Sequence, residues 1–270
     1  MGTTSAPTTV EDALAVLASG ARVINGGTDV MVPINEGLDR VDAWLSLRKV
    51  QSLRVIEKTE SGIRIGAGVT FAEIEAELAD LAPALVQAAS TVGSRQIRNV
   101  ATIGGNVATA SPAGDSLLPL LAYDAEVELA SLRGVRSMPL GQFFAGPKRT
   151  NRQPDELLTA ITIRDFRGAQ HFAKVGTRNA MVISICSICA RLDHERGIAR
   201  IAAGSVAPTP LLIPSAEEAL QRHDGSAEFS RLVVEASSPI SDHRASAEYR
   251  SHALGVLAVR VHRTLWQGAR

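Results

Sequence analysis

The sequence predicts an α+β protein, in which two mixed lobes of helices and strands precede a small sheet and C-terminal helices. The 270 residues correspond to about two folded units at roughly 150 residues per domain. Strand-like runs alternate with helical patterns up to about residue 165, and beyond it three strand-like runs follow one another. The chain is 45% hydrophobic and 21% charged, a balance typical of proteins that bury their own core.

The first lobe begins with a helix and a short strand. Thr8 and Glu11 have the spacing of a capping box, and apolar residues follow at helical intervals. Residues 22–24 then predict a strand that ends in a diglycine. Further strands are indicated at residues 43–47 and 55–56.

The second lobe begins with a strand whose residues, 62–66, alternate between apolar and polar. A capping box at Thr70 and Glu73 starts the next helix. One more helix, with proline in its first turn, and two strands follow at residues 83–92, 126–131 and 157–163.

The last region begins after a boundary at residues 165–169. Three strands are predicted there, at residues 171–175, 181–192 and 199–206. Ser215 and Glu218 predict a capped short helix. The last helix begins near Ser246 and has large or apolar side chains at i+4 spacing.

Charge and cysteine content exclude several classes of protein. The 28 basic and 28 acidic residues give a net charge of +0, which argues against nucleic-acid binding through a basic surface. Two cysteines exclude both a disulfide framework and an iron–sulfur cluster held by four thiolates of this chain. Since no apolar run reaches 18 residues and no secretory signal is present, we expect no transmembrane segment and a cytoplasmic location.

Two diglycine segments carry the first functional signal. They lie at residues 23–29 and 102–106, each after an apolar residue. Paired glycines adopt positive φ readily and leave backbone N–H groups uncovered, so that successive amides can bind an anion. Thr28, Asn106 and Thr109 would add side-chain donors. Neither segment has the pattern of a P-loop or of a dinucleotide fingerprint, and each alone is also typical of a tight turn.

The second diglycine lies within a recognisable signature. Residues 95–115 read RQIRNVATIGGNVATASPAGD. This segment resembles the FAD-binding (medium) subunit of molybdenum hydroxylases, the family of xanthine dehydrogenase and carbon monoxide dehydrogenase. Three further segments resemble this family, at residues 24–33, 172–184 and 246–250, so the resemblance covers nearly the whole chain.

The resemblance implies a more specific architecture. A PCMH-type FAD-binding module would occupy residues 1–165, with subdomains at about 1–57 and 58–165 and FAD between them. A C-terminal flavoprotein domain over 166–270 would consist of a three-stranded antiparallel sheet and a helical bundle. No His or Cys attachment motif is evident, so the FAD is expected to be non-covalent.

The resemblance also implies which residues bind FAD. The first loop would hold the pyrophosphate through Val23, Ile24, Asn25, Gly26, Gly27, Thr28 and Asp29. The second would contact phosphate and ribityl groups through Ala101, Thr102, Gly104, Gly105, Asn106 and Thr109. Asp115 would accept hydrogen bonds from ribityl hydroxyls and Leu158 would pack near the flavin. Lys174 would lie beside the isoalloxazine, where a cation stabilises the reduced cofactor.

Simpler interpretations of the same residues stay open. Asp115 could cap a helix beginning near Ser116, because Asp is a favoured N-cap residue. Lys174 could be a solvated strand residue. Cys186 and Cys189 form a CxxC, but positions i and i+3 of a strand face opposite sides, so we expect two core residues.

Other titratable groups give weaker signals. The six histidines show no spacing typical of a metal site, and no metal site is predicted. Arg95 and Arg98 could face the phosphates of a cofactor, or they could face a partner subunit.

The resemblance implies an electron-transfer subunit of a heterotrimeric molybdenum hydroxylase. It would accept electrons from [2Fe–2S] clusters of a small partner subunit and pass them to NAD+, oxygen or a quinone. A large partner subunit would carry the molybdenum–pterin, and two heterotrimers would form a heterohexamer. The chain itself would need no catalytic acid or base.

The large subunit would select the substrate of the complex. We expect a purine or other N-heterocycle first, and aldehydes or carbon monoxide as less favoured substrates. Two alternatives for this chain are a flavin-free structural subunit of the same complex and a stand-alone FAD-dependent oxidase.

Overall fold

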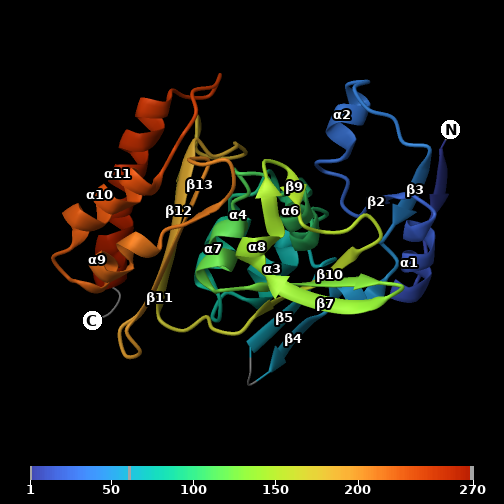
Figure 1. The fold of residues 1–270 in the computed structure, drawn as a ribbon, viewed down its shortest axis with the longest axis horizontal. Coiled ribbons are helices and arrows are strands. Elements are labelled where there is room, and N and C mark those ends of the chain that lie inside the picture. Colours follow the sequence, from blue (N-terminus) through green and yellow to red (C-terminus); the bar gives the residue numbers. More distant parts are fainter. Residues whose placement is uncertain (1, 60–61, 268–270) are drawn as a thin grey trace.

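The computed structural model describes residues 2–59 and 62–267 as three units that follow one another along the molecule (Figure 1). Each unit combines a sheet with helices, which confirms the α+β class. The helices are α1 (Val10–Ala18), α2 (Met31–Asn35), α3 (Phe71–Glu77), α4 (Pro83–Ser90), α5 (Arg95–Arg98), α6 (Ile103–Thr109), α7 (Leu117–Ala122), α8 (Leu140–Phe143), α9 (Glu217–Gln221), α10 (Ser226–Ala236) and α11 (Ala247–Gln267). Short 3₁₀ turns are η1 (Gln51–Arg54) and η2 (Pro214–Ala216).

The strands form three main sheets and one small hairpin. They are β1 (Thr3–Ser5), β2 (Arg22–Ile24), β3 (Ala43–Ser46), β4 (Ile56–Thr59), β5 (Gly62–Gly66), β6 (Glu126–Ser131), β7 (Gly134–Pro139), β8 (Phe144–Gly146), β9 (Arg149–Thr150), β10 (Leu157–Ile163), β11 (Ala169–Val175), β12 (Cys186–Asp193), β13 (Ile198–Gly204) and β14 (Leu211–Leu212). In space the orders are β1-β3-β2, β4-β5-β10-β6-β7, β11-β12-β13-β14 and β8-β9.

The N-terminal unit is a parallel sheet with α1 packed against it. Leu14 and Leu17 of α1 share a core with Leu45 of β3. The helix is capped by Thr9, whose Oγ1 accepts a hydrogen bond from the Asp12 amide at 3.1 Å. The predicted Thr8–Glu11 box was therefore one residue too early.

The central unit is an antiparallel sheet whose apolar side chains share one core with those of α3, α4, α6 and α7. The capping box of Thr70 and Glu73 is present at the start of α3, as predicted. Pro83 occupies the first turn of α4, also as predicted. Four short helices of the first two units were not predicted: α2 in the N-terminal unit, and α5, α6 and α8 in the central one.

The C-terminal unit is an antiparallel sheet covered by α10 and α11 (Figure 1). Its three long strands were predicted, whereas the two-residue β14 was not. The predicted strand from residue 181 begins only at Cys186, because Met181 has a φ of +52° that strand backbone does not adopt. Ser215 lies within η2 and does not cap α9, which lacks a side-chain cap; α10 was missed entirely.

The two cysteines of β12 face opposite cores, as predicted. Cys186 packs in the C-terminal core and Cys189 in the central core, and both thiols are free. Burial raises the pKa of Cys186 to about 12 and that of Cys189 still further. Both side chains are therefore inert core residues.

Strand β11 joins the C-terminal unit to the central one by lying along α4. Gln87 Oε1 accepts a hydrogen bond from the Phe172 amide at 2.8 Å, and Gln170 Oε1 accepts one from the Ala84 amide at 3.2 Å. The Ser205 amide, just after β13, donates to the Pro112 carbonyl at 2.8 Å, so the C-terminal sheet also lies beside the turn that follows α6. The predicted domain limits, at about residues 57 and 165, stay predictions.

No helix among the described residues is a candidate for a membrane span. None of them combines the length and the hydropathy that a bilayer span needs.

Candidate functional site

The first diglycine lies against the chain segment that leads into the second. A Cβ on Gly26 would lie 2.1 Å from the Val100 carbonyl oxygen, so only glycine permits this approach. Gly27 has a φ of +74°, which again favours glycine. The N-terminal and central units thus meet where the two predicted cofactor segments come together.

The backbone amides of the first loop are available to an outside acceptor. Within residues 2–59 and 62–267, no hydrogen bond is donated by the amides of residues 25–29. Four of these residues are half-buried and Asp29 is exposed. Successive N–H groups without partners form an anion-binding concavity, so this loop fits a pyrophosphate.

The second diglycine is part of a helix, which corrects the prediction of a turn with free amides. Gly104 and Gly105 lie in the first turn of α6, and Thr102 is its N-cap, accepting from the Gly105 amide at 3.1 Å. The amides of Ile103, Gly104 and Asn106 also donate within the chain, to the carbonyls of Val69, Ala67 and Thr102. Backbone amides of this segment are therefore occupied.

The two glycines of α6 have different structural roles. A Cβ on Gly104 would lie 2.5 Å from the Ala67 Cβ and 2.6 Å from the Ala67 carbonyl oxygen. Gly104 is therefore required for close packing of α6 on Ala67, just after β5. Gly105 is exposed, and an added Cβ would meet only Thr102 Oγ1, at 3.1 Å. Gly105 thus presents bare backbone to an approaching group.

Because its backbone amides are occupied, the second segment can offer donors to a ligand only through side chains. Asn106 Oδ1 accepts from Ser116 Oγ at 2.7 Å, and this bond fixes the orientation of the Asn106 amide group. Thr109 Oγ1 lies 3.5 Å from Asp29 Oδ2, so the second segment reaches the first loop. Ala101 precedes the helix and is buried beside Gly26.

Asp115 and Lys174 form a buried ion pair between the central and C-terminal units. Lys174 Nζ lies 2.6 Å from Asp115 Oδ2, and the side chains are 12% and 8% exposed. Lys174 is therefore not a solvated strand residue. Asp115 does not cap α7 either, since the N-cap residue of that helix is Ser116 and it has no side-chain cap bond.

Further contacts hold both members of the pair in place. Asp115 Oδ1 accepts from Ser184 Oγ at 2.5 Å, and Oδ2 accepts from Thr91 Oγ1 at 3.2 Å. Lys174 Nζ also donates to the carbonyls of Thr91 and Val182, each at 3.3 Å. The sequence prediction missed Thr91 and Ser184 as partners, although Ser184 ends a segment that resembled the family.

Leu158 lies apart from the polar network, in the core of the central unit. It belongs to β10, beside a register shift between Leu158 and Ala160. The next residue, Thr159, accepts a hydrogen bond from the Ala67 amide, and Ala67 packs against Gly104. Leu158 is thus placed near the base of α6.

The structure distinguishes the two arginines that precede α6. Arg98 Nε lies 2.6 Å from Glu75 Oε1, and its NH1 group donates to the carbonyls of Val92 and Gly93. Arg98 therefore stabilises the loop before α5, whereas Arg95 is exposed.

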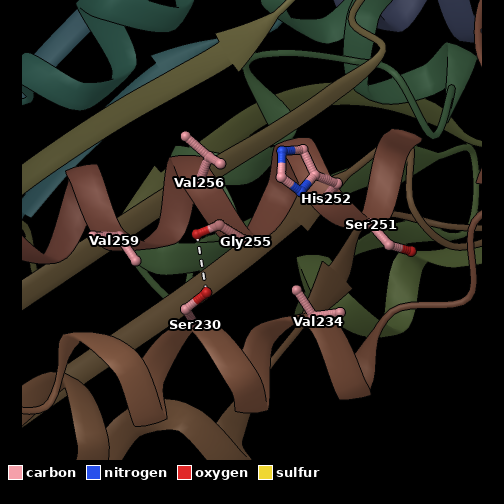
Figure 2. A pocket seen from close by; sticks show the side chains of 7 residues that line it. All are labelled: Ser230, Val234, Ser251, His252, Gly255, Val256 and Val259. Atoms are coloured by element: carbon pink, nitrogen blue, oxygen red, sulfur yellow. Dashed lines mark hydrogen bonds between the residues drawn. The ribbon is translucent and has the colours of Figure 1, made fainter. Parts of the chain in front are cut away.

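A separate groove lies between α10 and α11, where Ser230 Oγ donates to the Gly255 carbonyl at 3.0 Å (Figure 2). Its lining residues are Ser230, Val234, Ser251, His252, Gly255, Val256 and Val259. They include none of the predicted cofactor residues. Among the described residues, no three His, Cys, Asp or Glu side chains gather as a metal-binding group.

Two family models match this chain, one after the other along its length. Residues 2–163 match the FAD binding domain in molybdopterin dehydrogenase, and residues 171–265 match the CO dehydrogenase flavoprotein C-terminal domain. The chain belongs to the FAD-binding subunits of molybdenum hydroxylases. As a member of this family it is the flavoprotein component of an oxidoreductase, with FAD as its cofactor, as predicted.

Similar proteins support this membership over most of the chain. The xanthine dehydrogenase FAD-binding subunit of Escherichia coli O157:H7 is 36% identical over 269 residues, covering 94% of this chain and 92% of the relative. The nicotinate dehydrogenase FAD-subunit of Eubacterium barkeri is 36% identical over 251 residues, covering 87% and 83%. The structure of quinoline 2-oxidoreductase from Pseudomonas putida 86 superposes with a TM-score of 0.93 at 25% identity, covering 100% and 98%.

Proposed function

We propose that this subunit binds FAD non-covalently between its first loop, α6 and the Asp115–Lys174 pair, and transfers electrons within a larger complex. The observation that carries this proposal is the run of backbone amides at residues 25–29 without acceptors in the described chain. They lie where Gly26 approaches Val100 and where Asp29 approaches Thr109. Donors gathered in this way suit a pyrophosphate without requiring a positive net charge.

Each remaining residue has a role that its chemistry supports. Val23 and Ile24 hold the loop on β2, and Thr28, Asn106 and Thr109 offer side-chain donors. Asp115 already accepts three hydrogen bonds, and a carboxylate has about four acceptor sites, so one is left for a ribityl hydroxyl. Lys174 places its Nζ beside that position.

Bound FAD supplies the capacity to exchange electrons. The chain contributes binding, orientation and electrostatics, and none of the described residues needs to act as acid or base. Both cysteines are buried on opposite faces of β12 and cannot together ligate a cluster, so the proposal assigns the [2Fe–2S] clusters to a small partner subunit. It assigns the molybdenum–pterin to a large partner subunit. Two such heterotrimers would form a heterohexamer in the cytoplasm, with NAD+, oxygen or a quinone as final acceptor.

The substrate of the complex is proposed to be a purine or another N-heterocycle. Relatives named for xanthine, nicotinate and quinoline support this class, since all three molecules are nitrogen heterocycles.

Titration of the purified full-length chain with FAD tests the proposal. We expect one FAD per chain and a visible flavin spectrum, and a chain that stays colourless in excess FAD would refute FAD binding. Gly105→Val should reduce FAD affinity at least tenfold, because its side chain would project from the exposed backbone of α6 toward the cofactor.

A matched glycine provides the control. Gly141 is also exposed in a short helix, and a Cβ there meets Leu212 Cδ1 at an ordinary 3.6 Å. Gly141→Val should therefore retain full affinity. If Gly105→Val binds FAD as tightly as Gly141→Val, the assignment of α6 to the site is wrong.

A further inference from the structure

A buried arginine at the start of α11 is not explained by any direct role at the cofactor site. Arg250 is 2% exposed, and it belongs to the segment at residues 246–250 that resembles the family. Its NH1 group donates to two backbone carbonyls, those of Ile185 and Ser205, the latter at 3.1 Å. Its NH2 group donates to Asp242 Oδ1 at 2.7 Å.

One carbonyl belongs to Ser205, which contacts the turn containing Asp115, and the other to Ile185, the chain neighbour of a residue that contacts it. Ile185 follows Ser184, whose Oγ donates to Asp115 Oδ1 at 2.5 Å. Ser205 donates from its Oγ to the Ser184 carbonyl at 3.0 Å, and from its amide to the Pro112 carbonyl at 2.8 Å. The guanidinium of Arg250 is thus linked to Asp115 through Ser184, and to the same turn through Ser205.

Asp242 fixes the outer end of this connection. Its Oδ1 accepts hydrogen bonds from the amides of Arg244 at 2.8 Å and of Ala245 at 3.3 Å, as well as from Arg250. The Asp242 amide in turn donates to the Ala245 carbonyl, which closes the loop. A carboxylate held in this way has little freedom, so it orients the guanidinium that pairs with it.

From these contacts we propose that Arg250 is a positioning residue of the FAD site, acting through Ser184 on Asp115. Arg250 touches no residue assigned to FAD contact. It holds the Ile185 and Ser205 carbonyls at a fixed separation, and the Ser184 hydroxyl therefore reaches Asp115 Oδ1. Oδ2 of the same carboxylate is held by Lys174 and Thr91.

This inference rests on the proposed function, because Asp115 matters only if it faces FAD. Removing the guanidinium would leave two buried carbonyls without donors and release Ser184. The Asp115 carboxylate would then lose one of the hydrogen bonds that fix its orientation. A lysine has no planar fork that reaches two carbonyls and a carboxylate together.

The test is a double-mutant cycle on the full-length chain, with the FAD dissociation constant as the readout. Ser184→Ala and Arg250→Met should each weaken FAD binding about tenfold, a change equal to the loss of one charge-assisted hydrogen bond. Because both act on the same carboxylate, the double variant should also be about tenfold weaker and not about a hundredfold. If the effects of the two substitutions on the dissociation constant multiply, the connection through Ser184 is wrong. If Arg250→Met leaves the dissociation constant unchanged, the whole proposal is wrong.

A stability control separates positioning from general loosening. Val261→Ala removes a fully buried side chain from the same helix and should lower the Tm while changing the dissociation constant by less than about twofold. If Val261→Ala weakens FAD binding as much as Arg250→Met, Arg250 has no specific role.

A second variant covers the case in which Arg250→Met does not fold. Asp242→Ala removes only the anchor of the guanidinium and should weaken FAD binding severalfold; wild-type affinity in that variant would overturn the proposal. The wild-type titration tells the two proposals apart. A wild-type chain that binds no FAD refutes the proposed function, whereas FAD binding that is insensitive to Asp242 and Arg250 refutes only this inference.

Discussion

Asp115 and Lys174 are coupled so closely that stability and cofactor binding are expected to depend on the same two side chains. Their atoms lie 2.6 Å apart and both groups are nearly buried. Removing one member of such a pair leaves a buried charge without a partner, whereas replacing both by neutral groups removes that cost. Stability and binding can therefore be separated by comparing single and double variants.

Lys174→Met should reduce the free energy of unfolding by about 3 kcal/mol, because it leaves the Asp115 carboxylate buried among weaker donors. The double variant Asp115→Asn/Lys174→Met should recover most of this stability but not FAD affinity, since the acceptor for the ribityl group has changed. Urea unfolding and FAD titration measure the two quantities. A double variant as unstable as Lys174→Met would contradict the buried-pair explanation.

Acid should weaken the anchor at Asp242. The Arg244 amide, together with the Arg250 guanidinium, lowers the pKa of Asp242 from 3.8 to about 2. A lowered folded-state pKa stabilises the fold above the unfolded value, and this contribution is lost as the pH falls from about 4 to about 2. The Tm difference between wild type and Asp242→Asn should therefore be largest near neutral pH and shrink over that interval; a difference that is constant with pH would argue against it.

At the scale of single elements, local signals predicted what local hydrogen bonds determine. Thr70 and Glu73 do form a capping box, and β6 and β10 have the predicted bounds. The second diglycine was assigned to a turn because the two diglycine segments look alike in sequence. What makes α6 a helix is the Thr102 cap, and what requires Gly104 is contact with Ala67, a partner 37 positions away that no local pattern reveals.

The adjacent glycines of α6 should consequently respond differently to alanine. Gly104→Ala places a Cβ within 2.6 Å of Ala67 atoms and should destabilise the fold by about 1–3 kcal/mol. Gly105→Ala meets only Thr102 Oγ1 and gains helix propensity, so it should change stability by less than about 1 kcal/mol. Urea midpoints for the two variants decide the matter, and equal losses would mean that the packing of α6 on Ala67 is not as tight as the structure indicates.

At the scale of the whole molecule, the proposed FAD site lies where three units meet. The first loop belongs to the N-terminal unit, α6 and Asp115 to the central unit, and Lys174 and Ser184 to the C-terminal unit. The family resemblance predicted most of these residues, but not how they meet. Ser184 and Asp115 are 69 positions apart, and their contact depends on how the C-terminal sheet docks. Docking relies on Arg191, a buried side chain for which the sequence pattern predicted only a strand position.

Arg191→Met should loosen the C-terminal unit from the central one. Arg191 is 1% exposed; its Nε donates to the Ala122 carbonyl at 2.9 Å and its NH1 lies 3.1 Å from Asp165 Oδ2. Its loss would leave a buried carbonyl without that donor and should cost about 3 kcal/mol. The exposed Arg231, which pairs with Glu228 and Glu235 on α10, is the matched control and should cost less than about 1 kcal/mol when replaced by Met.

Hydrogen exchange can localise that loosening. The amides of Ala84 and Phe172 donate to glutamines across the junction between the two units, so peptides from α4 and β11 should exchange faster in Arg191→Met than in Arg231→Met. FAD affinity should fall in the first variant alone, because Lys174 and Ser184 lie on the unit that moves. Exchange that rises equally throughout the protein would mean that Arg191 supports global stability and does not fix the C-terminal unit over Asp115.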